Sequence, residues 1–158
     1  MKYRGLTWDK DKQEHKYVYG LPSYGFETEE IEEIGTQYGD FYNINPTTLG
    51  EETEYRDSTG KKMYTGDITT LEVDGEIREF EVVRTTTDRE YNVLDGFKGQ
   101  TTKVRLSGVI AFKWHTKGKD YYLLPCVSEA GVADTVRMKI IDTVHERAVR
   151  ESESKGKK

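Results

Sequence analysis

The sequence has little of what several common classes of protein require. Cys126 is the only cysteine among 158 residues, which excludes a disulfide within the chain and suits a reducing compartment. No apolar run approaches the roughly 18 residues that a membrane-spanning helix needs. Residues 1–12 are charged and lack the apolar core of a secretion signal. We therefore expect a protein of the cytoplasm with no membrane partner.

Apolar residues are also scarce. Hydrophobic residues make up 34% of the chain, the same share as charged residues. The 11 tyrosines partly compensate, because a tyrosine buries a large ring while its hydroxyl stays hydrated. The chain is therefore expected to fold around a thin core, which an interface with a partner could complete.

Basic residues are fewer than acidic residues over most of the chain. The formal net charge is -5, and the last twelve residues, 147–158, hold five Lys/Arg and two Glu. Residues 1–146 therefore carry 19 basic and 27 acidic residues, a balance of -8. An acidic body argues against a general nucleic-acid binder, whose affinity depends on neutralising phosphates. It fits a protein partner or solubility alone.

What the sequence does have is short alternating runs separated by turns, which predict a mainly β fold. The strongest signal is Asp74-Gly75 between two alternating runs, which predicts a tight hairpin. The residues expected to point inward on its two arms are Ile68, Leu71, Val73, Ile77, Phe80 and Val82. Because Ile68 and Leu71 are three positions apart, we expect a bulge near residues 69 and 70.

A second turn, Gly66-Asp67, precedes this hairpin. Glycine permits the backbone conformation of the turn, and the Asp67 carboxylate can accept hydrogen bonds from backbone N–H groups. We interpret Gly66, Asp67, Asp74 and Gly75 as structural turn residues.

Other segments are ambiguous. Residues 28–35 fit a single helical turn or a loop, and residues 134–146 fit a helix or a strand, with β-branched residues favouring the strand. Residues 147–158 are expected to be a charged flexible tail. The expected organisation is one mainly β domain over residues 1–146. An alternative divides it into an N-terminal lobe, 1–55, and a barrel, 56–146.

Residues 55–68, YRDSTGKKMYTGDI, resemble the stretch that starts the barrel in the YopX family. Residues 3–20 resemble the family's opening strands and residues 138–146 its closing segment. Tyr55 stands where the family usually has Gly, and Asp142-Thr143 where it has Gly-Asn, so the resemblance is to a divergent member. It implies a small SH3-like β-barrel with additional N-terminal strands and little helix. It also implies a phage or prophage protein in a bacterial host, without an established activity or active site.

Two charged clusters are candidate interaction sites. The first is an acidic patch for protein docking, formed by Glu29, Glu30, Glu32 and Glu33. The second is a candidate nucleic-acid face within residues 97–119, formed by Lys98, Lys103, Arg105, Lys113 and Trp114. Aromatic side chains among lysines can stack bases. The simpler interpretations are a solvated acidic loop and a half-buried strand whose lysines point outward.

The sequence offers no clear catalytic or metal-binding constellation. Cys126 and His115 are the best nucleophile-and-base pair, but the apolar surroundings of Cys126 favour an inert thiol. The three histidines show no zinc-ligand spacing with Cys126. We expect no enzyme activity, no metal and no cofactor.

The sequence therefore favours a phage or prophage accessory protein that acts by binding a host or phage protein, or by self-assembly into a homo-oligomer. The alternative is a nucleic-acid-binding module that uses residues 97–119.

Overall fold

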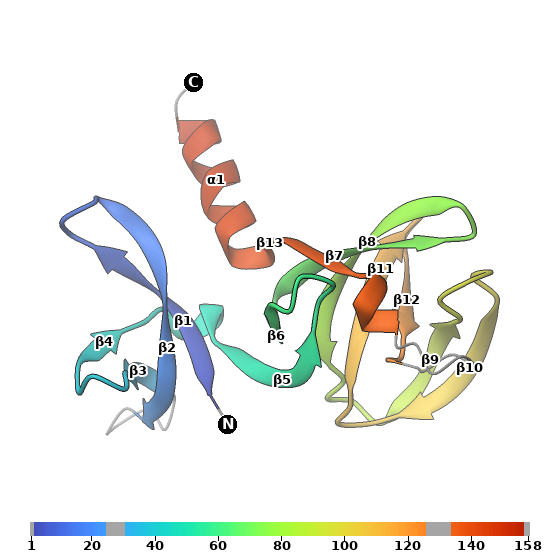
Figure 1. The fold of residues 1–158 in the computed structure, drawn as a ribbon, viewed down its shortest axis with the longest axis horizontal. Helices are drawn as coiled ribbons and strands as arrows, with labels where there is room; N and C mark the ends of the chain where they lie inside the picture. The colour runs from blue at the N-terminus through green and yellow to red at the C-terminus, as the bar shows by residue number, and fades with distance from the viewer. Residues whose placement is uncertain (1, 25–30, 126–133, 157–158) are drawn as a thin grey trace. The chain divides into compact units, whose positions relative to one another are not determined.

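The computed structural model describes residues 2–24, 31–125 and 134–156 of the chain. The chain divides into two compact units, residues 1–52 with 145–158, and residues 53–144. The described residues form thirteen β-strands, two short 3-10 helices and one α-helix (Figure 1). The prediction of a mainly β protein is therefore confirmed.

The first unit is built on an antiparallel sheet in the order β4-β3-β2-β1-β5. Its elements are β1 (Tyr3–Asp9), β2 (Glu14–Tyr24), β3 (Ile31–Gly35), β4 (Phe41–Asn43), the 3-10 helix η1 (Pro46–Thr48) and the start of β5 (Gly50–Arg56). Residues 31–35, expected to lie in a helical turn or a loop, are thus a strand. Asp9 ends β1 and its Oδ1 accepts hydrogen bonds from the N–H groups of Asp11 and Lys12 at 3.0 and 3.2 Å. This carboxylate holds the turn of the β1–β2 hairpin.

The core of the first unit is small. Val18, Ile34 and Ile44 are its buried residues, with partly buried Tyr3, Tyr42 and Leu49 around them. Gly5 lets β1 approach this cluster, because a Cβ there would lie 2.6 Å from the Ile44 Cδ1 atom. A core of this size fits the low apolar content of the sequence.

The helix α1 (Val144–Gly156) covers most of the segment expected to be a flexible tail. Seven of its thirteen residues are Glu, Arg, Ala or Lys, which are good helix formers, and opposite charges recur four positions apart at Glu146 and Arg150 and at Arg147 and Glu151. The flexible tail was predicted from the polarity of residues 147–158 alone, whereas the spacing of their charges supports a helix.

The second unit contains a seven-stranded sheet in the order β10-β9-β12-β11-β8-β7-β13. Its elements are β6 (Lys62–Tyr64), β7 (Asp67–Val73), β8 (Glu76–Arg84), β9 (Arg89–Leu94), β10 (Thr101–Leu106), β11 (Ile110–Thr116), β12 (Lys119–Leu123), the 3-10 helix η2 (Asp134–Arg137) and β13 (Lys139–Thr143). Within the seven-stranded sheet, all pairings are antiparallel except that of β12 with β9. Residues 134–146 therefore contain a strand, as β-branching favoured, flanked by η2 and the first turn of α1.

The closed barrel expected from the family resemblance is not confirmed. Within residues 2–24, 31–125 and 134–156, neither sheet closes on itself, and the seven-stranded sheet ends at β10 and β13. The edge strand β10 exposes Lys103 and Arg105. Charged side chains on an edge oppose pairing with another sheet.

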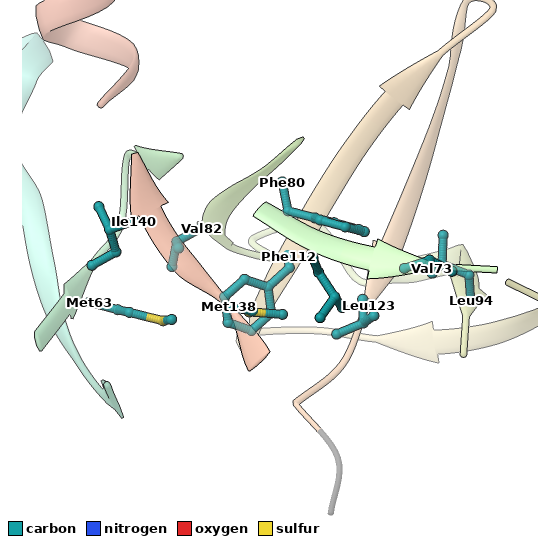
Figure 2. Packing of buried hydrophobic residues seen from close by; sticks show 10 residues of the cluster. Met63, Val73, Phe80, Val82, Leu94, Phe112, Leu123, Met138 and Ile140 are labelled. Atoms are coloured by element: carbon teal, nitrogen blue, oxygen red, sulfur yellow. The ribbon is translucent and has the colours of Figure 1, made fainter. Parts of the chain in front are cut away.

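The main core of the second unit gathers ten buried side chains from seven strands and the residue before β13. They are Met63, Leu71, Val73, Phe80, Val82, Leu94, Phe112, Leu123, Met138 and Ile140. Figure 2 shows these side chains converging from strands far apart in the sequence. Five of the six inward residues predicted for the hairpin are buried, but Ile77 is 73% exposed. Ile77 pairs with Glu72, and because it is three positions from Phe80 on β8, its side chain points to the face opposite this core.

The bulge predicted in β7 is absent from its pairing with β8, and an irregularity occurs instead in the partner strand β13. The β7–β8 pairing is regular through residues 69 and 70, and the irregularity lies in β13 between Ile140 and Asp142. Ile68 and Leu71 are both buried, as is Thr69 between them, because both faces of this part of β7 are covered. The odd spacing of apolar residues therefore reflects burial on two faces.

The two turns have the geometry that their residues favour. Asp74 and Gly75 have φ values of 52° and 76°, the positive values of a type I′ hairpin turn. Gly66 has a φ of 94°. The fully buried Asp67 accepts a hydrogen bond from the N–H of Tyr64 at its Oδ2, over 2.8 Å.

Asp57 joins a local turn to a distant strand. Its Oδ1 accepts hydrogen bonds from the N–H and hydroxyl of Thr59 and from the N–H of Lys61, at 2.9, 2.7 and 3.0 Å. Its Oδ2 accepts one from the N–H of Ile140 in β13, at 3.0 Å. Burial of Asp57 opposes ionisation, but these donors outweigh it and lower the pKa of the carboxyl below its ordinary 3.8. The residue holds β13 against the start of the second unit.

Candidate functional site

The first unit carries a hollow of about 620 Å³ lined mainly by apolar and aromatic groups. We call it the tyrosine groove, after Tyr17, Tyr19, Tyr38 and Tyr42, which line it together with Lys2, Lys16, Val18, Gly20, Leu21, Gly35, Thr36 and Gln37. β2 supplies six of these residues, and β3 with the turn after it supplies four. The volume lies in the range of pockets that hold a drug-sized ligand or a few side chains of a peptide.

Two glycines let the strands below the groove approach closely. A Cβ atom built on Gly20 would overlap the carbonyl oxygen of Gly35. Gly35 in turn pairs with Phe41, whose Cε1 would lie 2.9 Å from a Cβ on Gly35. The Phe41 ring thus covers backbone that a side chain would otherwise occupy, and the main chain of Gly20 and Gly35 forms part of the groove lining.

Large apolar side chains are unusually exposed around this groove. Tyr38 is 82% exposed, Phe41 68%, Leu21 65% and Tyr19 44%. Leu21, Gly35 and Phe41 are cross-strand neighbours on β2, β3 and β4, so their side-chain positions lie in one row on one face. A contiguous exposed apolar patch of this kind marks an interaction surface more often than a scatter of single residues does.

The turn between β3 and β4 presents Tyr38 in a fixed backbone conformation. The N–H of Thr36 donates to the carbonyl of Asp40 over 2.8 Å, and the N–H of Gly39 donates to the carbonyl of Thr36 over 3.1 Å. Gly39 has a φ of 84°, which glycine adopts without strain. We call residues 36–40 the Tyr38 turn.

The charged side chains among the described residues lining the groove are both lysines. The Lys16 Nζ lies 3.6 Å from the Asp9 Oδ2 and 5.1 Å from the centroid of the Tyr42 ring. Because Asp9 partly neutralises Lys16, the groove is only weakly cationic. The lining groups can bind apolar side chains through their rings and accept an anionic group at the two lysines.

The acidic patch predicted for protein docking is only partly described. Glu29 and Glu30 lie outside the described residues. Glu32 and Glu33 lie on β3 as consecutive residues, at the point where the pairing of β3 with β2 shifts register. Glu32 is exposed and Glu33 is half-buried. The acidic docking patch stays a prediction.

The predicted nucleic-acid residues are also divided by strand alternation. Lys113 and Trp114 are neighbours on β11 and therefore point to opposite faces. The Lys113 Nζ lies 3.8 Å from the Glu81 Oε1, whereas Trp114 packs beneath the Arg78 guanidinium at 4.1 Å.

The remaining three cationic residues of that candidate face lie at the edge of the second unit. Lys98 is exposed in the loop before β10, and Lys103 and Arg105 are exposed on β10 itself. The Arg105 Nε lies 3.0 Å from the Asp88 Oδ1. The structure therefore does not gather the five residues on one surface.

One member of the candidate catalytic pair falls outside the described residues. Cys126 lies outside the described residues. His115 is exposed, and its Nδ1 lies 2.6 Å from the Asp120 Oδ1. Among the residues with a described position, no three His, Cys, Asp or Glu side chains gather where they could hold a metal ion. None of the described helices is long and apolar enough to cross a membrane.

The groove was not predicted from the sequence, although residues 17–21 carry a signal for it. Residues 17–21, YVYGL, alternate in a way typical of a half-buried strand. The outward-pointing residues of this strand are Tyr17, Tyr19 and Leu21, where a solvated face would carry polar residues. An alternating strand with large apolar residues on both faces is the sign that was missed.

The chain was compared with protein-family models, curated proteins and solved structures, and nothing in any of the three comparisons matched it. The fold and the groove geometry thus define the chain as a mainly β protein of two units with a candidate binding groove. The resemblance to the YopX family stays a prediction from the sequence.

Proposed function

We propose that this protein is a binding module that holds an apolar segment of another protein in the tyrosine groove. The observation that carries the proposal is the coincidence of the 620 Å³ hollow with the exposed side chains of Tyr19, Leu21 and Tyr38. Leaving such side chains in water is unfavourable, at about 25 cal/mol per Å² of apolar surface. Covering them with a partner would recover that free energy.

The groove chemistry supports binding rather than catalysis. Its described lining contains no carboxylate, cysteine or histidine, the groups that most often transfer protons or attack a substrate. Tyrosine rings provide large contact areas that lose little conformational entropy on binding. The lack of enzyme activity stays a prediction, as does the role suggested by the resemblance of residues 55–68. On that resemblance we propose an accessory protein of a phage or prophage, acting in the cytoplasm of a bacterial host.

Nucleic-acid binding by residues 97–119 remains the alternative, but its support is weaker. Stacking on Trp114 and phosphate contacts by Lys113 would have to occur on opposite faces of β11. The ion pairs of Lys113 with Glu81 and of Arg105 with Asp88 would also compete with phosphate. We therefore favour the protein-binding groove.

A selection of peptides displayed on phage tests the proposal. We expect the protein to enrich short peptides that share an aromatic or aliphatic anchor residue, with dissociation constants of about 1–100 μM, as for small interfaces. Leu21→Ser should weaken their binding at least tenfold, because it places a hydroxyl where the anchor would pack. Binding would be measured by fluorescence anisotropy of labelled peptides.

Ile77→Ser is the matched control for this experiment. Ile77 is 73% exposed, as Leu21 is 65% exposed, but it lies in the second unit, on β8. The control should leave peptide affinity unchanged. Enrichment of no peptide, or an equal loss of affinity in both variants, would remove the tyrosine groove as the binding site.

A further inference from the structure

We infer that the occupant of the tyrosine groove is the Tyr38 turn of a second copy of this chain, so that the protein forms a symmetric dimer. This inference rests on the proposed function and names the partner for that site. It starts from Tyr38, which is 82% exposed. Tyrosine is among the residues that most often anchor protein interfaces.

The backbone of the Tyr38 turn is preorganised for docking. Its hydrogen bonds between Thr36 and Asp40 and between Gly39 and Thr36 fix the backbone. A fixed backbone loses less conformational entropy on binding than a mobile loop does. The turn is followed directly by Phe41, which is 68% exposed and provides a second apolar side chain next to the turn.

The projecting turn and the hollow lie on the same surface. Tyr38 lines the tyrosine groove together with Tyr19 and Leu21, and its exposure shows that it does not fill that groove within its own chain. In an interface with two-fold symmetry, the same patch on both copies must be complementary to itself. A patch that carries both an anchor and a receptor for it meets this condition, with each Tyr38 entering the other copy's groove.

Charge is complementary in the same arrangement. The turn carries the exposed Asp40 beside Tyr38, and the charged groups among the described groove residues are Lys2 and Lys16. Insertion of the turn would bring Asp40 of one copy toward the lysines of the other. Opposite charges at the rim of an interface fix its register and favour the correct encounter.

The size of the patch sets the expected strength. Two tyrosine anchors, with Phe41 and Leu21 of each copy, would bury on the order of 1,000 Å² in total, since an aromatic side chain buries roughly 150–250 Å². This is the low end for a specific interface. We therefore expect a dimer with a dissociation constant of about 1–100 μM.

Sedimentation equilibrium of the full chain between 1 and 500 μM tests the inference. Wild-type protein should shift from monomer toward dimer across this range. Tyr38→Ser and Leu21→Lys should each raise the dissociation constant about 30-fold or more, the effect of removing an interface anchor. Ile77→Ser should change it less than twofold. Far-UV circular dichroism of each variant would show whether its β structure is retained.

Mixing the two variants gives a result that a folding defect would not produce. Tyr38→Ser keeps every groove residue except Tyr38 itself, including Leu21, and Leu21→Lys keeps its turn, so a mixed dimer retains one turn-in-groove contact in which Tyr38 meets Leu21. Energy transfer between differently labelled variants should therefore report heterodimers at concentrations where each variant alone is monomeric. Heterodimer formation no greater than homodimer formation would overturn the inference.

The remaining outcomes separate this inference from the proposed function. A wild-type protein that stays monomeric at 500 μM, or a dimer that Tyr38→Ser does not weaken, overturns the self-docking arrangement. If peptide selection still succeeds in either case, the groove keeps its role and binds a different protein. Failure of both experiments would remove the proposed function together with the dimer.

Discussion

Replacing Asp57 with alanine is expected to lower the free energy of unfolding of the second unit by about 3 kcal/mol, because a buried donor loses its charged acceptor. The N–H of Ile140 donates to the Asp57 Oδ2 inside the protein. Without the carboxylate this N–H stays buried and unsatisfied. The three donors of Thr59 and Lys61 lie in an exposed turn, where water can replace the lost acceptor at smaller cost.

Two further variants separate the local from the long-range part of this effect. Asp57→Asn keeps one carbonyl oxygen, which can still accept from the turn donors. Its N–H₂ group then faces the N–H of Ile140 and cannot accept from it, so this variant should cost about 1.5–2 kcal/mol. Asp95→Ala is the matched control. The Asp95 carboxylate accepts from the N–H groups of Phe97, Lys98 and Gln100, all within its own loop, and its removal should cost about 1 kcal/mol.

Urea denaturation followed by tryptophan fluorescence would measure these differences. The chain has two tryptophans, Trp8 in the first unit and Trp114 in the second. In a Trp8→Phe background the signal therefore reports the second unit alone, which avoids assuming that both units unfold in one step. Equal losses for Asp57→Ala and Asp95→Ala would contradict the role assigned to the contact with β13.

The same carboxylate should make the second unit sensitive to acid. Because folding lowers the pKa of Asp57, the unfolded chain binds the proton more readily than the folded chain does. The contribution of Asp57 to stability is thus fully present above the ordinary pKa of 3.8 and is lost as pH falls through the lower pKa of the folded state. Denaturation at pH 7 and at pH 3 should show a smaller drop in stability for Asp57→Ala than for the wild type.

Asp57 also shows what the sequence could and could not predict. Residues 57–60, DSTG, predict a turn because the Asx hydrogen bonds and the glycine act within a few residues. The bond to Ile140 spans 83 positions, and no local pattern encodes it. The same distinction explains why the Asp74-Gly75 hairpin was predicted correctly, whereas closure of a barrel was not confirmed. Closure depends on which strands meet at the sheet edges.

The groove follows the same rule. Alternation places Tyr17, Tyr19 and Leu21 on one face of β2, and this can be derived from the sequence. That Gly35 and Phe41 join Leu21 in one row depends on the register of β2, β3 and β4, which strand pairing decides. By contrast, Lys113 and Trp114 were assigned to one nucleic-acid face because they are adjacent in sequence. Adjacent residues on a strand point to opposite faces, so this assignment overlooked the alternation of β11.

Gly20→Ala should be the most damaging single-methyl change in the first unit, with an expected loss of about 3 kcal/mol from overpacking. The added Cβ would overlap the Gly35 carbonyl oxygen and lie 3.2 Å from the Ile34 Cγ2. Backbone atoms cannot rotate away, so β3 must move from β2 as a whole. Ile34 belongs to the small core of this unit, and the shift would therefore disturb the core as well as the pairing.

Gly35→Ala is the matched comparison, because the two glycines line the same groove and differ in what an added methyl group meets. At Gly35 the Cβ would approach the Phe41 Cε1 and Cδ1 atoms at 2.9 and 3.3 Å. Phe41 is 68% exposed and its ring can turn into solvent, so the cost should stay below about 1 kcal/mol, partly offset by the lower chain entropy of alanine. Urea denaturation in a Trp114→Phe background would compare the two through Trp8.

The pair also links the stability of the first unit to its proposed binding role. Gly20→Ala should reduce peptide affinity even where the unit remains folded, because β2 and β3 together form the groove. Gly35→Ala should leave the unit stable but weaken self-docking, since it displaces Phe41 from the patch that faces the second copy. If Gly20→Ala is as stable as Gly35→Ala, the close approach of β2 and β3 is wrong, and the groove built on that approach would have to be revised with it.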